Sequence, residues 1–281
     1  MDIEIRLLLE SDLPAALRLK ELAGWNQTEN DWKRLLQLEP HGCFCATSNG
    51  EVIGTATTIT YGRDLAWIGM VLVNPEHRRR GIGTKLMKTA MTYLDAAGVT
   101  TVKLDATRAG RPVYQGLGFN EESIIERWEG TGIESTPGRS ILDEAKQSEV
   151  LTLDRRAFDA DRTTLIRMLM NESSVQPCFA KDDRNGMTGF ALARRGTVAT
   201  YVGPVVANEA KVASTLLDEM LGQLLHHRVY VDLNADFAQG RQILGERGFI
   251  KQRDLIRMSS GKRSNGGTSR LVFAIAGPEL G

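Results

Sequence analysis

The chain has 281 residues, of which 42% are hydrophobic and 25% charged, as is typical of a soluble globular protein of about two domains. Its 35 lysines and arginines equal its 35 aspartates and glutamates, which argues against bulk attraction to nucleic acid or to an anionic membrane. No run of about 18 apolar residues occurs, and charges interrupt the N-terminal segment, so we expect neither a membrane span nor a signal peptide. The odd number of cysteines favours a reduced, cytoplasmic protein.

The first part of the chain predicts a strand, a helix and a hairpin. Residues 1–24 contain the strand and an amphipathic helix, with Ser11 or Asp12 as the helix cap. Strands at residues 42–48 and 52–62 follow, and the residues between them are typical of a tight turn.

Two of the cysteines, Cys43 and Cys45, lie two positions apart in the first hairpin strand, so their thiols face the same side. Burial as small hydrophobic residues is favoured over metal ligation, because no second pair accompanies them. No histidine, cysteine or aspartate spacing typical of a metal site occurs elsewhere, and we expect no metal.

The elements that follow predict a mixed sheet. A strand at residues 65–73 precedes a helix over residues 83–97, which Gly98 closes in the position where glycine is preferred. A strand at residues 99–107 and a short helix within residues 110–119 come next. This order predicts an α/β fold (α+β mixed sheet): a mixed, mostly antiparallel sheet flanked by helices.

The second half of the chain repeats the first. The segment CFCATSNGEVIGTA is echoed by CFAKDDRNGMTGFA, and LDATRAGRPVYQGLGF is echoed by VDLNADFAQGRQILGERGF. Glycine, serine, threonine and proline cluster between the two halves, over residues 130–148. We therefore predict two tandem domains of the same fold, residues 1–135 and 148–281.

The turn before the predicted helix combines three arginines, Arg78, Arg79 and Arg80, with two glycines, Gly81 and Gly83. The first amides of a helix have no backbone partner, and together with the helix dipole they attract anions. Glycine lets a ligand approach the backbone, and guanidinium groups suit phosphate oxygens. The turn is interpreted as a cradle for a diphosphate, with a solvated basic turn as the alternative.

The pattern Val73-x-Pro75-x-x-Arg78-x-x-Gly81-x-Gly83 resembles the acetyl-CoA signature of the GCN5-related N-acetyltransferases (GNAT). The resemblance implies acetyl-CoA as cosubstrate, with its pyrophosphate on the turn and its pantetheine arm along the preceding strand end. It also implies a tandem bacterial type, in which a divergent second domain follows an active-looking first one. The cofactor-binding residues implied are Val71, Leu72, Val73, Arg78, Arg79, Arg80, Gly81, Ile82, Gly83, Thr84 and Tyr114.

Two residues are catalytic candidates. The resemblance places the phenol of Tyr114 near the thioester sulfur, where it could protonate the departing thiol, although a packing role is the alternative. A carboxylate at the place of Asp105 serves some relatives as the general base, but this side chain could instead cap a turn. The strand at residues 65–73 lacks the glutamate that other relatives carry, so a base residue is not assured.

Four residues are candidate acceptor contacts: Trp25, Asn26, Tyr61 and Asp232. Trp25 and Asn26 lie where the first two helices of the resembling family form one wall of the acceptor groove. Trp25 could equally join those two helices, and the role of Tyr61 is just as open. Asp232 belongs to the second half, which is expected to close the acceptor groove.

The second half has lost the features of the cosubstrate site. Four residues are missing where the arginine–glycine turn stood, and Leu244 replaces Tyr114. The sequence therefore predicts one acetyl-CoA site per chain and a second domain that shapes the acceptor site.

Together these patterns predict an acetyl-CoA-dependent N-acetyltransferase that acts by direct transfer on a primary amine of a small-molecule or amino-acid-like acceptor. A non-catalytic acyl-CoA-binding regulatory module and a protein or peptide N-acetyltransferase are the alternatives. We expect a monomer or homodimer in the cytoplasm, with no nucleic-acid or membrane partner.

Overall fold

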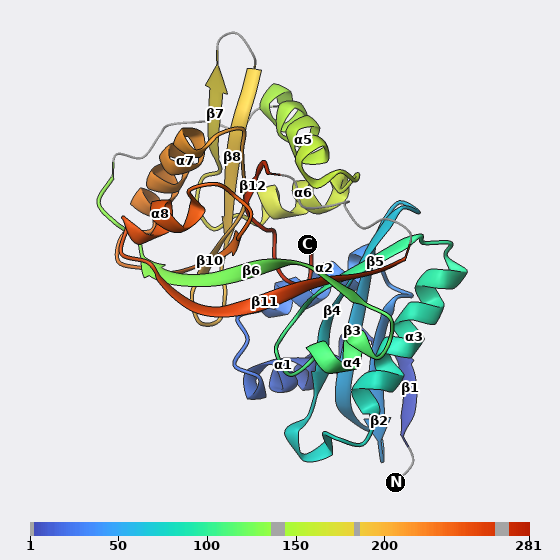
Figure 1. Cartoon of the computed structure of the whole chain (residues 1–281). Coiled ribbons are helices and arrows are strands. Elements are labelled where there is room, and N and C mark those ends of the chain that lie inside the picture. Colours follow the sequence, from blue (N-terminus) through green and yellow to red (C-terminus); the bar gives the residue numbers. More distant parts are fainter. Residues whose placement is uncertain (1–2, 136–143, 183–185, 262–269) are drawn as a thin grey trace.

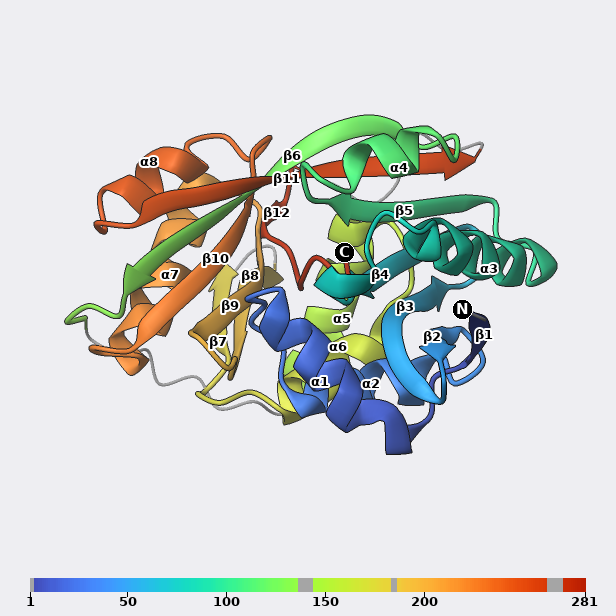
Figure 2. The same cartoon turned by 90° about the horizontal axis from the view of Figure 1, so that it is seen from below.

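The computed structural model describes residues 3–135, 144–182, 186–261 and 270–281 (Figures 1 and 2). Within these residues, helices flank a single mixed, mostly antiparallel sheet in the strand order β1-β2-β3-β4-β5-β11-β6-β10-β12-β9-β8-β7. The first half supplies β1 (Glu4–Leu7), α1 (Leu13–Leu22), α2 (Glu29–Leu38), β2 (Cys43–Ser48), β3 (Glu51–Tyr61), β4 (Leu65–Val73), α3 (Ile82–Ala96), β5 (Thr101–Ala106), α4 (Arg111–Gln115) and β6 (Asn120–Thr131). The second half supplies α5 (Glu144–Phe158), α6 (Thr163–Asn171), β7 (Cys178–Asp182), β8 (Gly186–Arg194), β9 (Thr200–Ala207), α7 (Ala210–Gln223), β10 (Arg228–Asn234), α8 (Gly240–Gly245), β11 (Ile250–Gly261) and β12 (Val272–Ala274).

The predicted α/β architecture is confirmed, and so are most predicted elements of the first half. Strand β4 has the predicted bounds, and α3 begins one residue before the predicted start. Gly98, with φ 75°, follows α3 in the left-handed conformation that was expected there. The predicted cap of α1 is wrong in its chemistry: the Asp12 carboxylate accepts from the Leu9 amide and from Arg6, not from an amide of α1.

The first half has two helical layers, one on each face of its strands. Ile82 and Leu86 of α3 pack with the buried side chains of Ile53 and Ile68 on one face. Helices α1 and α2 cover the other face, where Trp32 belongs to a core that continues into α5 and α6.

The last strands of the two halves are exchanged. Strand β11 of the second half lies between β5 and β6, with Ile256 opposite Ala106 and Leu255 opposite Ile125. Strand β6 of the first half reaches across to β10 (Figure 1). Because β11 and β6 also pair with each other, the exchange joins the strands of the two halves. The sheet is therefore continuous across the predicted domain limits, and residues 136–143 within the predicted linker lie outside the described residues.

Strands β4 and β5 run parallel and pair only at Ala66 and Trp67. Beyond this pairing β4 contains a bulge, where Met70 has φ 49° and its carbonyl accepts a hydrogen bond from Thr55 Oγ1 at 2.8 Å. The end of β4, residues 71–73, consequently has no strand beside it on the β5 side. A gap of this kind exposes backbone groups to a ligand.

The corresponding gap in the second half is filled. Strands β9 and β10 pair in parallel up to Val202 and Val231. Beyond that point β12 lies between them, with Val272 opposite Val206 and Ala274 opposite Leu233. The chain itself thus takes the place that stays open in the first half.

A buried cluster of charges around Arg194 of β8 joins the two halves. Arg194 donates to Asp31 of α2 at 3.0 Å, to Glu279 at 3.0 Å and to the Ala276 carbonyl at 2.7 Å. Its side chain is only 7% exposed, and it lies over the ring of Tyr201. This cluster holds the segment after β12 against the first half.

We expect Arg194→Met to lower the free energy of unfolding by about 3–5 kcal/mol, because the buried Glu279 loses its counter-charge and Asp31 keeps only Arg34. Urea denaturation measures the change. The matched control is Arg155→Met, which removes an exposed pair with Asp161 and should cost about 0–1 kcal/mol. Equal and small effects of the two substitutions would contradict a stabilising role of the buried cluster.

All three cysteines are buried and free, as the packing interpretation of Cys43 and Cys45 predicts. Burial raises the pKa of the Cys43 thiol to about 12 and that of Cys45 to about 11, which keeps both thiols neutral. Within the described residues, no helix has the length and apolarity needed to span a bilayer.

Candidate active site

The turn between β4 and α3 has the backbone geometry of an anion cradle. Arg78 Nε donates to the Val73 carbonyl at 3.1 Å, which folds this side chain back along the strand end. Gly81 has φ 76° and precedes the first residue of α3. A Cβ on Gly83 would meet only Val73 Cγ2, at 3.8 Å, so space lies open above the first amides of the helix.

The other predicted cosubstrate contacts divide into backbone and side-chain groups. Leu72 and Ile82 point into the core, so only their main-chain atoms remain for a ligand. Arg79 and Arg80 are exposed at the turn, and Thr84 is half-buried in the first turn of α3. The diphosphate interpretation therefore rests on amides at the helix start, with exposed positive charge around them.

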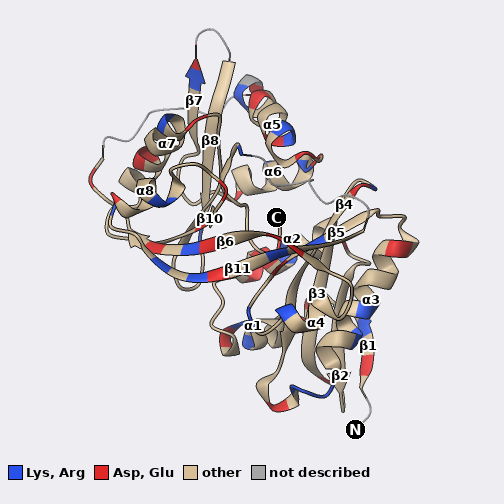
Figure 3. Cartoon of the chain, in the orientation of Figure 1, with Lys and Arg blue, Asp and Glu red and all other residues tan. Residues whose placement is uncertain are grey.

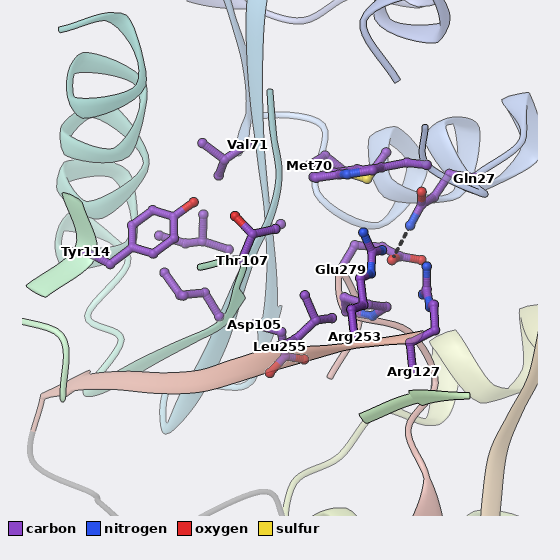
Figure 4. Close-up of a pocket in the computed structure, with 15 residues that line it drawn as sticks. Gln27, Met70, Val71, Asp105, Thr107, Tyr114, Arg127, Arg253, Leu255 and Glu279 are labelled. Carbon is purple, nitrogen blue, oxygen red and sulfur yellow. Dashed lines mark hydrogen bonds between the residues drawn. The ribbon is translucent and has the colours of Figure 1, made fainter. Parts of the chain in front are cut away.

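A cavity of about 60 Å³ lies between the gap at β4 and the segment after β12 (Figure 4). Residues of both halves line it: Trp25, Gln27, Ile68, Gly69, Met70, Val71, Leu104, Asp105, Thr107, Tyr114, Arg127, Arg253, Leu255, Pro278 and Glu279. The cavity thus extends from the open end of β4, at Val71, to the buried Glu279 of the second half.

Tyr114 forms one side of this cavity, as Figure 4 shows. Its ring is half-buried, packs edge-on against Phe119 and lies over Gly110, where a Cβ would come within 2.8 Å of the ring. Burial raises the pKa of Tyr114 to about 12, so the phenol stays protonated at neutral pH. Its hydroxyl makes no hydrogen bond within the described part of the chain, which leaves it available as a proton donor.

Asp105 also lies at the cavity wall, but both of its carboxylate oxygens are occupied. Arg257 of β11 donates to them from Nε and Nη2, each at 2.8 Å. Burial raises the pKa of Asp105, and the nearby guanidinium of Arg257 opposes that shift. A base needs an oxygen that can reach the substrate proton, and this bidentate pairing favours positioning β11 instead.

We expect Asp105→Asn to leave the acidic limb of the pH–rate profile where it is. The same substitution should lower the free energy of unfolding by up to about 3–5 kcal/mol, because Arg257 loses its buried counter-charge. Initial rates between pH 5 and 9 and a denaturation curve measure the two effects. A displaced acidic limb in a stably folded variant would restore Asp105 as the titrating base.

Of the predicted acceptor residues, Trp25 lies at the cavity, whereas Asn26 does not. The Asn26 amide is used to hold a loop of the second half. Its Oδ1 accepts from the amides of Val198 and Ala199, and its Nδ2 donates to the Ala199 carbonyl at 3.0 Å. Asn26 therefore fixes the relative position of the two halves.

Tyr61 and Asp232 are likewise committed to internal contacts. The Tyr61 hydroxyl donates to the Leu280 carbonyl at 2.6 Å, and its ring packs against Phe158. Asp232 is fully buried and accepts from Arg127 at 2.8 and 2.6 Å. Asp232 reaches the cavity only through Arg127, which lines it.

Sequence reasoning missed five polar residues of the cavity wall: Gln27, Thr107, Arg127, Arg253 and Glu279. Gln27 adjoins the predicted pair Trp25 and Asn26, so the sequence points to the correct segment. Arg127 of β6 and Arg253 of β11 meet here because of the strand exchange, and Glu279 lies in the segment after β12.

Within its described residues, the second half has no equivalent of the cradle or the phenol. Only Asn208 and Glu209 separate β9 from α7, and the gap that an incoming ligand would need holds β12. Leu244 of α8 is fully buried at the position corresponding to Tyr114. These contacts support a structural role for the second half.

Family models match both halves of the chain. The model of the acetyltransferase (GNAT) family matches residues 8–119, and that of an acetyltransferase (GNAT) domain matches residues 150–274. The chain therefore belongs to the GNAT acetyltransferase family, with two GNAT domains in tandem, and it is an acyltransferase by class.

Three curated proteins are similar to this chain. The uncharacterised N-acetyltransferase YitH of Bacillus subtilis is 27% identical over 78% of this chain and 79% of its own length. Holothin acyltransferase of a Pseudoalteromonas species is 24% identical over 92% of this chain and 87% of its own. The ribosomal protein bS18-alanine N-acetyltransferase of Escherichia coli is 30% identical over 43% of this chain and 82% of its own.

The fold is also similar to that of a proposed acetyltransferase from Pyrococcus horikoshii. That structure superimposes with a TM-score of 0.80 at 21% sequence identity, and the match covers 99% of this chain and 96% of the other. The likeness extends over both halves, so it bears on the tandem arrangement as a whole.

Proposed function

We propose that the protein transfers an acetyl group from acetyl-CoA to the primary amine of a small-molecule acceptor. The observation that carries the proposal is the open gap beside β4, which has the anion cradle at one end and Tyr114 with a cavity at the other. No other gap between the described strands combines these features, since β12 fills the corresponding one.

The residues present fit the cosubstrate. The amides at the start of α3 and the arginines around them suit a pyrophosphate. The unpaired edge of residues 71–73 suits the amides of an extended pantetheine arm, as a strand edge accepts an added strand. Acetyl-CoA supplies an activated acyl group, and the chain supplies orientation and a proton.

In the proposed reaction the neutral amine nitrogen forms a bond to the acyl carbon, and the carbon–sulfur bond breaks. The Tyr114 phenol donates its proton to the departing sulfur, and the nitrogen gives up its extra proton to solvent, from which Tyr114 is reprotonated. Since both Asp105 oxygens are bound to Arg257, we assign no base residue. The enzyme then relies on the small neutral fraction of the amine.

A small cavity of about 60 Å³, walled by both halves, favours a small acceptor over a protein chain. The similar bS18-alanine N-acetyltransferase acts on a ribosomal protein, but its match covers only 43% of this chain. A protein acceptor and a non-catalytic acyl-CoA-binding role are the competing proposals. Three buried free cysteines fit a reducing compartment such as the cytoplasm. The proposed oligomeric state is a monomer or homodimer.

A thiol-release assay with acetyl-CoA and a broad panel of amines, amino acids and peptides tests the proposal. We expect amine-dependent release of CoA with an equimolar N-acetyl product identified by mass spectrometry. Acetyl-CoA binding without turnover of any amine would instead support the binding module. Turnover confined to peptides would support the protein acceptor.

A further inference from the structure

Arg253 of β11 lines the cavity that holds Tyr114, yet the proposed chemistry gives it no role. Its side chain is half-buried, and its Nε is buried without a hydrogen-bond partner. Directly across the sheet stands Arg127 of β6, a second positive charge. Like charges opposite each other destabilise a sheet. Asp232, which pairs with Arg127, offsets part of this cost, but no described residue forms an ion pair with Arg253 itself.

The other charged residues of the two exchanged strands do have counter-charges. Figure 3 shows charges of both signs gathered along β6 and β11, where the strands cross from one half to the other. The ion pairs are Glu121 with Arg111, Glu122 with Lys103, Glu126 with Arg241 and Lys251, Arg127 with Asp232, Glu129 with Arg228, Asp254 with Lys251, and Arg257 with Asp105. Among the described residues of β6 and β11, Arg253 alone has no such partner.

The other charged residues of the cavity wall are held in ion pairs. Asp105 and Arg127 are each paired with a residue behind the wall, and Glu279 is paired with Arg194. Arg253 remains as the charged residue of the wall without an ion-pair partner among the described residues. Burial lowers the pKa of Arg253 and the nearby Arg127 lowers it further, while Asp232 opposes part of that shift. A bound anion would relieve both effects.

Gln27 offers the cavity an acceptor atom that has no hydrogen-bond donor among the described residues. Its Nε2 donates to Glu279 at 2.8 Å, whereas its Oε1 is buried with no partner. Figure 4 shows Gln27, Glu279, Arg253 and Arg127 gathered on the side of the cavity away from Tyr114. A ligand that satisfied this side would present an anionic group to Arg253 and an N–H or O–H group to Gln27.

We propose that the acceptor is an amine that carries a carboxylate, an amino-acid-like molecule whose carboxylate binds Arg253. The inference rests on the proposed function, because it names the substrate class of the same site. A carboxylate matches the planar guanidinium, which binds it through two parallel hydrogen bonds. The amine then faces the Tyr114 side, and a second polar group of the acceptor donates to Gln27.

The test compares matched acceptors: each amino acid against its decarboxylated amine and its amide, for example phenylalanine, phenethylamine and phenylalaninamide. We expect kcat/KM of the wild-type enzyme to favour the carboxylate member at least about tenfold. Arg253→Met should lower kcat/KM for that member about 10- to 150-fold, the loss of one hydrogen-bonded charge, and change the neutral members by no more than a few fold. Arg253→Lys should restore part of the preference.

Arg108→Met is the matched control, since this arginine lies nearby and its side chain is 86% exposed. It should leave the preference unchanged. Equal turnover of charged and neutral members, or the same loss on both in Arg253→Met, would overturn the inference while amine-dependent thiol release still supported the proposed function. Absence of thiol release with every acceptor, alongside measurable acetyl-CoA binding, would contradict both.

Discussion

Gly83→Glu is expected to abolish measurable acetyl-CoA binding, a loss of at least about 100-fold in affinity, without unfolding the protein. The new carboxylate would stand against the pyrophosphate in the space that the cradle leaves open, where a Cβ meets only Val73 at 3.8 Å. Two like charges in contact, together with the blocked amides, account for about 3 kcal/mol or more. Helix α3 should tolerate the change, because an acidic residue suits the first turn of a helix.

Isothermal titration calorimetry measures the affinity, and circular dichroism confirms the fold. Lys211→Glu is the matched control, because Lys211 is the second residue of α7 as Gly83 is of α3. That variant should bind acetyl-CoA as the wild type does. Unchanged affinity in a folded Gly83→Glu variant would show that the cradle lies elsewhere.

Tyr114→Phe is expected to lower kcat about 10- to 1,000-fold while acetyl-CoA affinity stays within a few fold. General acid–base groups contribute about 10²–10⁴-fold, and water can replace part of the effect. The ring keeps its packing on Phe119 and Gly110, so the substitution removes only the proton donor. Burial raises the pKa of Tyr114 to about 12, so the phenol stays protonated below that pH. Deprotonation of Tyr114 should therefore cause no loss of wild-type activity up to about pH 10.

Steady-state rates and calorimetry on the same preparations separate these two quantities. Tyr230→Phe serves as the control, since Tyr230 lies on β10 outside the cavity wall and should retain full activity. A Tyr114→Phe enzyme with wild-type kcat would assign Tyr114 to packing alone.

Much of the first half could be predicted because its signals are local. The bounds of β4 follow from a nine-residue run of apolar residues between a turn and a proline, and the turn from Arg78 to Gly83 has its chemistry in consecutive residues. Tyr114 could be found because the motif around it is also local. Its place at the cavity agrees with that expectation, although its catalytic role remains a prediction.

The exchange of β6 and β11 could not be predicted from local patterns. A strand forms the same backbone hydrogen bonds with either neighbour, and its alternation of side chains is the same in both arrangements. The placement of Arg253 beside Arg127 depends on that exchange, so Arg253 did not stand out in the sequence. Asp105 and Asp232 look like isolated carboxylates in the sequence, but arginines 152 and 105 positions away along the chain bind them.

The filled gap in the second half was predicted only in part. The loss of the arginine–glycine turn was visible as a shorter segment between Asn208 and Leu216, but nothing indicated that Val272–Ala274 would lie between β9 and β10. The segment RLVFAIAG, residues 270–277, is predicted to be a strand from its alternation, but alternation does not say which strands it lies between. Its position nonetheless supplies a second, independent reason for a single cosubstrate site.

Calorimetric titration of the wild-type chain with acetyl-CoA tests the central claim most directly. The account predicts saturable binding with a stoichiometry of one per chain, since the gap beside β4 is open and the gap beside β9 is filled by β12. Two sites per chain, or no binding at all, would contradict it.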